Sequence, residues 1–147
     1  MRRLARLACV LIVGAWCAPA VEELSSLVGS VVDPANLPTF SVITPSLCND
    51  GHDCVNASVD AFAHKVLQPI LDSAAYQSGN TAVMVMYDED RPVPNLLIAP
   101  TAGRGANHTS GAGHAAMLRT WDEMLGLPLI SQPAITGAIS LRGPAHI

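Results

Sequence analysis

Two adjacent carboxylates, Asp88 and Glu89, directly follow an apolar run at residues 81–87. Placing two like charges at the end of a buried strand is costly unless a cation or hydrogen-bond donors compensate for them. A hard divalent cation is one such compensator, because it prefers oxygen ligands. A solvated turn after a strand would also accommodate acidic residues. The pair therefore predicts either a metal site or an exposed turn.

A histidine, His52, lies between Gly51 and Asp53 in a short segment bounded by cysteines. An imidazole beside carboxylates can act as an acid, donate to a phosphate or ligate a metal. Asp50 and Asp53 could orient this imidazole, or they could cap the helix that follows. The alternative for His52 is an ordinary histidine of a surface loop.

The cysteines of this segment, Cys48 and Cys54, flank a glycine at a spacing that can close a small loop by a disulfide. An oxidising compartment would permit such a bridge. A thiolate metal site is the alternative, although two cysteines without a second pair are a weak zinc signal. The bridge would hold the residues between the cysteines in one geometry.

A second histidine of interest, His114, follows a glycine-rich segment and precedes a helical pattern at residues 115–125. The beginning of a helix offers unpaired backbone N–H groups and a partial positive charge, which favour anions such as phosphate. His114 can therefore face a ligand at the N-terminus of this helix.

The elements that must position these side chains alternate between strand and helix patterns. Apolar runs at residues 40–44, 81–87 and 95–99 predict strands, and apolar stripes predict helices at residues 56–76, with Pro69 as a kink, and 115–125. This order predicts the α/β class, with a partial αβα sandwich and a mainly parallel central sheet. In such sheets active residues gather beyond the carboxyl ends of the strands. The proline-containing residues 131–147 are expected to form a loose tail.

The N-terminus has the pattern of a secretory signal peptide. Basic residues at Arg2, Arg3 and Arg6 precede a short apolar run, which ends in Ala18-Pro19-Ala20. We expect cleavage after Ala20, a domain at residues 21–130 and a location outside the cell or in the cell envelope. A membrane-anchoring or buried helix is the alternative, but the run is shorter than the roughly 20 residues of a spanning helix. No stable membrane span is expected elsewhere.

The charge balance excludes one class of partner. The chain has 147 residues, a formal net charge of −4 and a single lysine, Lys65. A nucleic-acid-binding protein needs a basic face that neutralises phosphates, and this composition cannot build one. We expect no nucleic-acid partner, and the sequence does not indicate an oligomeric state.

The segment at residues 37–127 resembles the secreted bacterial phosphoesterase family, which includes acid phosphatases and phospholipase C relatives within the alkaline-phosphatase-like superfamily. The matching words are LPTFSVITPSLCNDGHDC (37–54), ILDSAAYQSGNTAVMVMYDED (70–90), VPNLLIAP (93–100) and GHAAMLRTWDEMLGLP (113–128). Their order and spacing are similar to the C-terminal half of the family domain, which implies the alkaline-phosphatase-like fold for this portion.

What the resemblance implies is metal-assisted hydrolysis of a phosphate ester or a phospholipid head group. The acidic pair Asp88 and Glu89 matches the family's metal ligands, for a divalent ion of unknown identity. His52 matches a histidine near the scissile phosphate, with Asp50 and Asp53 as supports. His114 matches the histidine that opens the last helix and contacts or positions phosphate. Cations and imidazoles at these positions would neutralise the charge of a transferring phosphoryl group.

The resemblance has a departure that leaves the activity open. Family members carry an upstream Glu-Asn metal-binding element and a hydroxyl nucleophile, and neither is found within these residues. The alternatives to a hydrolase are therefore an inactive remnant of the family and a secreted binding domain without catalysis.

Overall fold

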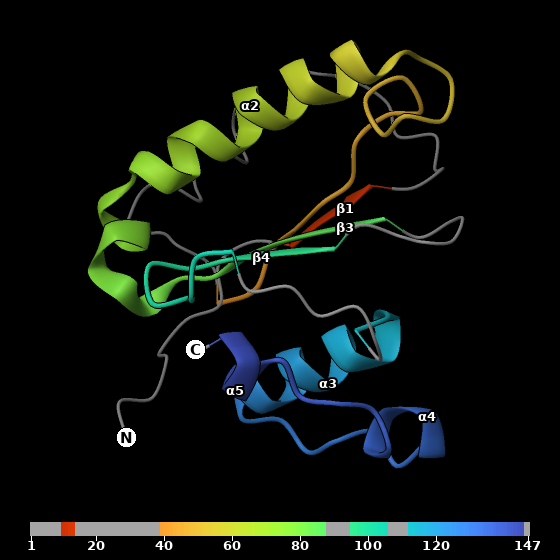
Figure 1. Cartoon of the computed structure of the whole chain (residues 1–147), viewed down its shortest axis with the longest axis vertical. Helices are drawn as coiled ribbons and strands as arrows, with labels where there is room; N and C mark the ends of the chain where they lie inside the picture. Colours follow the sequence, from red (N-terminus) through yellow and green to blue (C-terminus); the bar gives the residue numbers. More distant parts are fainter. Residues whose placement is uncertain (1–9, 14–38, 88–94, 106–111, 146–147) are drawn as a thin grey trace.

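The computed structural model describes residues 10–13, 39–87, 95–105 and 112–145. A four-stranded sheet in the order β2-β1-β3-β4 forms the middle layer. Helix α2 covers one face of the sheet, and α3 with the short helices α4 and α5 lies on the other (Figure 1). The predicted α/β class is confirmed, and the described residues form a helix–sheet–helix arrangement.

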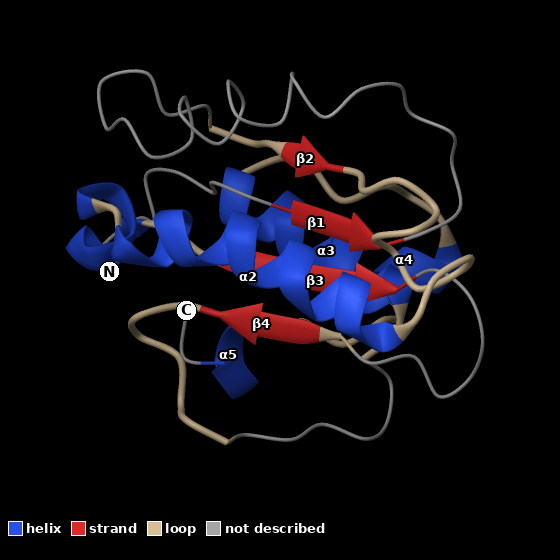
Figure 2. Ribbon diagram, turned by 90° about the horizontal axis from the view of Figure 1, so that it is seen from above, coloured by secondary structure: helices blue, strands red, loops and turns tan. Residues whose placement is uncertain are grey.

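The sheet is mixed in direction. Strand β1 (Val10–Val13) is parallel to β2 (Val42–Ile43) and to β3 (Val83–Tyr87). Strand β3 is antiparallel to β4 (Leu96–Ile98). Figure 2 shows the arrows of β1, β2 and β3 pointing one way and that of β4 the other.

Strand β1 lies inside the apolar run that predicts the signal peptide. Val10 is in register with both Val42 and Met84, so β1 fills the position between β2 and β3. An apolar tetrapeptide with three β-branched residues, Val-Leu-Ile-Val, suits a central strand as well as it suits the apolar part of a leader. Cleavage after Ala20 stays a prediction, and it would remove this strand.

Side chains of β3 alternate between two apolar clusters. Val83 and Val85 pack with Val66 and Ile70 of α2 (Asn56–Asp72) on one face. Met84 and Met86 face the other side, together with Met117 of α3 (His114–Leu125). The two-residue period of a strand explains this division, because successive side chains point to opposite faces. Burial on both faces matches the continuous apolar run from which the strand was predicted.

Helix α2 begins at the expected residue and ends earlier than expected. Val55 is its N-cap and Asn56 its first residue, and no side chain caps it, so Asp50 and Asp53 do not have the capping role that the sequence left open. The helix includes Pro69 and ends at Asp72, four residues before the expected end at Tyr76. The hydroxyl of Ser73 donates to the carbonyl of Ile70 at 2.6 Å and accepts from the N–H of Tyr76 at 3.2 Å. These bonds satisfy backbone groups that a helix end would leave unpaired. A π-helical turn, Tyr76–Asn80, follows and leads into β3.

The C-terminal segment is more firmly attached than the sequence predicted. Helix α4 (Pro133–Thr136) and helix α5 (Arg142–Ala145) flank residues that pack on α3. Leu141 is buried in the methionine-rich cluster beneath the sheet. The expectation of a loose tail from residue 131 is therefore wrong for residues 133–142, because side chains of α3 bind their backbone. In the described part of the chain, no helix is both long and apolar enough to cross a membrane.

Candidate functional site

The three parallel strands bring two candidate segments to one edge of the sheet. Since β1 is parallel to both β2 and β3, the carboxyl ends of all three lie at the same edge. The segment with the cysteines follows β2, and residue 88 follows β3. Neighbouring strands lie about 4.8 Å apart, so the ends of β2 and β3 are separated by about 10 Å across β1. Ligands of α/β proteins bind at such an edge.

A disulfide closes the loop after β2, as its spacing predicted. The Sγ atoms of Cys48 and Cys54 are 2.00 Å apart and their Cα atoms 4.6 Å apart. Inside the bridge, the N–H of Asp50 donates to the carbonyl of Ser46 at 3.0 Å. Gly51 has a φ of 98°, a conformation that a residue with a Cβ atom adopts only with strain. The bridge and this glycine fix the chain direction on both sides of His52.

Asp50 is the buried member of this loop, with 5% of its surface exposed. Its Oδ1 accepts the backbone N–H of His52 at 2.8 Å, which shapes the turn. Its Oδ2 is buried and has no hydrogen-bond partner among the described residues. A buried carboxylate oxygen without a partner can ligate a cation or accept a hydrogen bond from an N–H or O–H donor. Asp50 therefore shapes the turn around His52 and also presents an unmatched oxygen.

His52 and Asp53 form a pair on the outside of the loop. The Nδ1 of His52 and the Oδ1 of Asp53 are 2.8 Å apart, and the two side chains are 54% and 55% exposed. Because an ionised carboxylate only accepts, the proton of this hydrogen bond belongs to Nδ1. Asp53 therefore orients the ring of His52, one of the two roles that the sequence left open for it.

His114 reaches the end of the neighbouring strand. It is the first residue of α3, which confirms its predicted place at the start of this helix. Its Nε2 lies 2.8 Å from the carbonyl oxygen of Tyr87, the last residue of β3. A carbonyl oxygen only accepts, so Nε2 carries the proton and donates it. The ring is thereby bound to the residue that directly precedes Asp88.

The acidic pair Asp88 and Glu89 lies outside the described residues, so its place as a metal site stays a prediction. Within residues 39–87, 95–105 and 112–145, no group of three or more His, Cys, Asp or Glu side chains is arranged to hold a metal ion. The structure thus brings His114 to the strand that precedes the pair, and it brings Asp50, His52 and Asp53 together in one loop.

Sequence reasoning missed the partner of His114. The acceptor is the backbone carbonyl of Tyr87, and a backbone group has no signature in residue type or spacing. It also missed a polar network on α3, centred on Arg119 and Glu123. Their separation of four residues is a helical ion-pair signal that could have been noticed, but its partners at residues 136–142 could not.

The described residues form an α/β fold in which the loop after β2 and the end of β3 lie at one edge of the sheet, the edge at which ligands of α/β proteins bind. A family model, the Phosphoesterase family, matches residues 20–127. The chain belongs to the Phosphoesterase family. Membership indicates hydrolysis of phosphate esters as the general activity. Comparisons with the curated proteins and with the solved structures return no match.

Proposed function

We propose that this protein is a metal-assisted phosphoesterase of the acid phosphatase or phospholipid phosphatase type. The observation that supports it best is the 2.8 Å contact between the Nε2 of His114 and the carbonyl oxygen of Tyr87. This contact brings an imidazole to the strand end after which Asp88 and Glu89 follow. Family membership supplies the reaction class, and the contact supports the choice of residues.

His52 is the proton donor in this proposal. Asp53 accepts from the Nδ1 of His52, so the imidazolium form would release its proton from Nε2. Hydrolysis breaks the P–O bond of the ester, and the leaving oxygen takes this proton. Water supplies the hydroxyl group that the phosphate retains. Asp50 accepts the backbone N–H of His52 and keeps the loop in position.

His114 is a phosphate-positioning group in this proposal. Its ring is exposed at the first turn of α3, where backbone N–H groups favour an anion. The bond to the carbonyl of Tyr87 occupies Nε2–H, so the ring would donate to a phosphate oxygen only in its doubly protonated form, in which Nδ1 also carries a proton. The ring therefore acts from a fixed orientation rather than as a mobile side chain.

Asp88 and Glu89 would hold the divalent cation. Their carboxylates are the ligands that a hard cation prefers, and the unmatched Oδ2 of Asp50 is a further acceptor at the same edge of the sheet. When bound, the cation would offset negative charge on the phosphoryl oxygens. We also propose that the observed α/β arrangement is part of an alkaline-phosphatase-like domain with a mainly parallel central sheet.

The disulfide of the loop supports an oxidising compartment, outside the cell or in its envelope.

Release of phosphate from an aryl phosphate, with Mg²⁺, Mn²⁺, Ca²⁺ or Zn²⁺ added singly, tests the proposal. We expect metal-dependent turnover that falls about 10²-fold or more in His52→Ala and in Asp88→Asn. His64→Ala is the matched control, because His64 is an exposed histidine of α2 away from the sheet edge. A bis-aryl phosphodiester and phosphatidylcholine vesicles, used in parallel, separate the phosphatase type from the phospholipase type.

The alternative is a family member that binds phosphate or metal without turnover. Such a protein would show a thermal shift with divalent ions or inorganic phosphate but no hydrolysis above that of His52→Ala. Absence of turnover with every ion would overturn the enzymatic proposal.

A further inference from the structure

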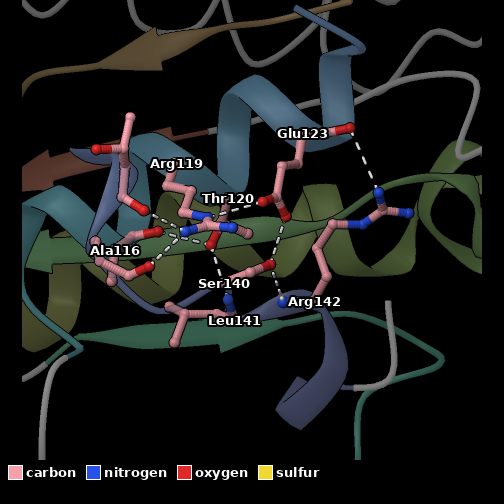
Figure 3. A network of polar contacts seen from close by, with 9 residues as sticks. Ala116, Arg119, Thr120, Glu123, Ser140, Leu141 and Arg142 are labelled. Atoms are coloured by element: carbon pink, nitrogen blue, oxygen red, sulfur yellow. Dashed lines mark hydrogen bonds and ion pairs between the residues drawn. The ribbon is translucent and has the colours of Figure 1, made fainter. Parts of the chain in front are cut away.

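Residues 133–142, which we call the C-terminal strap, are bound to α3 through their backbone. The Nη1 of Arg119 donates to the carbonyl of Thr136 and to the carbonyl of Ala138, both at 2.8 Å (Figure 3). One guanidinium thus holds two carbonyls of the strap. Charge-assisted bonds of this kind are among the stronger hydrogen bonds in proteins.

A second set of contacts involves Glu123, one turn further along α3. Its Oε1 accepts from the Nε of Arg119 at 2.8 Å, and its Oε2 accepts from the hydroxyl of Ser140. The Nη1 of Arg142 donates to the backbone carbonyl of Glu123 at 3.4 Å. The hydrogen bond from Ser140 is the first cause that lowers the pKa of Glu123 below its ordinary value, followed in the same direction by Arg119. The carboxylate is therefore the charged centre of the network.

The strap also enters the core. Leu141 is 8% exposed and packs in the methionine-rich cluster with Met86 and Met117. The backbone N–H of Leu141 donates to the hydroxyl of Thr120 at 3.0 Å, and this hydroxyl donates to the carbonyl of Ala116 at 2.7 Å. The strap is thus fixed by apolar burial as well as by polar bonds.

The two partners of the His114–Tyr87 contact come from elements that this cluster joins. His114 precedes Met117 by less than one turn of α3, and Tyr87 follows Met86 in β3. Arg119 and His114 lie on the same helix, less than two turns apart, so the strap holds α3 close to its first residue. The family match ends at residue 127, so the strap lies outside the matched region.

We propose that the C-terminal strap is a positioning device that keeps the His114 ring on the carbonyl of Tyr87 and thereby orients it for phosphate. Arg119, Glu123 and Ser140 are positioning residues, since they act through α3. This inference rests on the proposed function for the role of His114, but the position of the ring can be measured without any activity.

The direct measurement is the exchange rate of the His114 Nε2–H proton, observed by NMR of ¹⁵N-labelled protein. His52, in the loop at the other candidate segment, provides an internal reference in the same spectrum. In Arg119→Ala and Ser140→Ala we expect this proton to exchange about fivefold faster or more, since the hydrogen bond opens more often. The His52 signals should stay unchanged. Arg119→Lys should give an intermediate rate, because an ammonium cannot reproduce the geometry of the guanidinium.

Two further variants separate positioning from a general loss of structure. Gln68→Ala removes an exposed hydrogen bond on α2, from its Nε2 to the Oδ1 of Asp72, and should leave the His114 proton unaffected. Gly137→Ala disturbs the strap without touching α3, because a Cβ atom there would lie 2.9 Å from the carbonyl oxygen of Pro133. It should accelerate exchange as Arg119→Ala does, even if Arg119→Ala fails to fold.

Where hydrolysis is measurable, Ser140→Ala should lower kcat more than it raises KM, because the orientation of His114 and not the folding of the site is altered. Unchanged exchange of the His114 proton in folded Ser140→Ala and Gly137→Ala would overturn the positioning role. Faster exchange in a protein without turnover would overturn the hydrolase proposal and leave the strap inference in place.

Discussion

The Nε2 of His114 donates to the carbonyl oxygen of Tyr87 at 2.8 Å, across 27 residues of sequence. This bond links the start of α3 to the end of β3, and the residue after Tyr87 is the first of the acidic pair. It fixes the tautomer of the ring, because a carbonyl cannot donate. Through this contact, the titratable ring of His114 reaches the end of β3, where the family resemblance predicts the metal ligands.

The first prediction concerns this bond. His114→Gln retains an N–H donor but cannot change protonation state, whereas His114→Ala removes the donor. We expect the Ala variant to lose about 1 kcal/mol of unfolding free energy and the Gln variant less, since an exposed hydrogen bond contributes modestly. Both should lose phosphate affinity, measured by isothermal titration with inorganic phosphate. Equal phosphate affinity in wild type and both variants would contradict a role for this ring.

The second prediction concerns the disulfide. In Cys48→Ser/Cys54→Ser we expect a loss of about 2 kcal/mol in unfolding free energy, because a loop of this length gains limited stability from closure. The rate of hydrolysis should fall by more than the loss of folded protein explains, since the bridge holds the turn around His52. Urea unfolding and aryl phosphate turnover, each with and without dithiothreitol, measure both effects. Dithiothreitol should impair the wild type and leave the double variant unaffected.

The third prediction concerns β1. Ile12 is in register with Met86 of β3, and β1 lies between β2 and β3, so Ile12→Lys introduces a charged residue on a central strand. We expect a loss of more than about 3 kcal/mol in unfolding free energy or failure to fold. Ile130→Lys is the control, because Ile130 is 45% exposed and should tolerate the change.

The same strand gives a test of the predicted leader. A chain that begins at Val21 lacks β1, so β2 and β3 lose the strand between them. We expect reduced strand content in its circular dichroism spectrum and increased aggregation, since unpaired strand edges associate. A stable monomer with the wild-type spectrum would contradict the place of β1 in the sheet.

The sequence predicted those elements whose signal is local. The run at residues 81–87 and the apolar stripe of residues 115–125 correspond to β3 and α3 because burial sets their period. The spacing of Cys48 and Cys54 left a disulfide and a thiolate metal site open, and the structure contains the disulfide. The place of His114 at the start of α3 was also predicted, from the glycine-rich segment before it and the helical pattern after it, whereas its contact with Tyr87 was not.

Other features depend on tertiary contacts that no sequence pattern indicates. The strap is held by carbonyls of Thr136 and Ala138, and a carbonyl is present at every residue. The prolines of residues 131–147 led to the prediction of a loose tail, whereas one of them, Pro133, begins a short helix. The run at Val10–Val13 satisfies the rules for a leader and for a central strand alike, and only its pairing partners distinguish them.

The last prediction concerns the pH dependence of the strap. The pKa of Glu123 is lowered from 4.5, first by the hydrogen bond from Ser140 and then by Arg119 and Arg142, while burial acts in the opposite direction. A carboxyl whose pKa is lower in the folded state contributes stability that is full above its unfolded pKa. This contribution is lost as the pH falls below 4.5 and through the folded pKa.

The variant Glu123→Gln measures this contribution. We expect it to lower the unfolding free energy by about 1 kcal/mol at neutral pH, because the side chain is partly exposed. The difference from wild type should shrink as the pH falls below 4.5 and disappear below the lowered folded pKa, since the wild-type carboxyl is then protonated in both the folded and the unfolded state. Urea unfolding followed by tryptophan fluorescence, repeated across this range, gives the difference. Asp60→Asn removes an exposed carboxylate of α2 and is the matched control. A difference that stays constant at every pH would mean that Glu123 supports the strap by its shape and not by its charge.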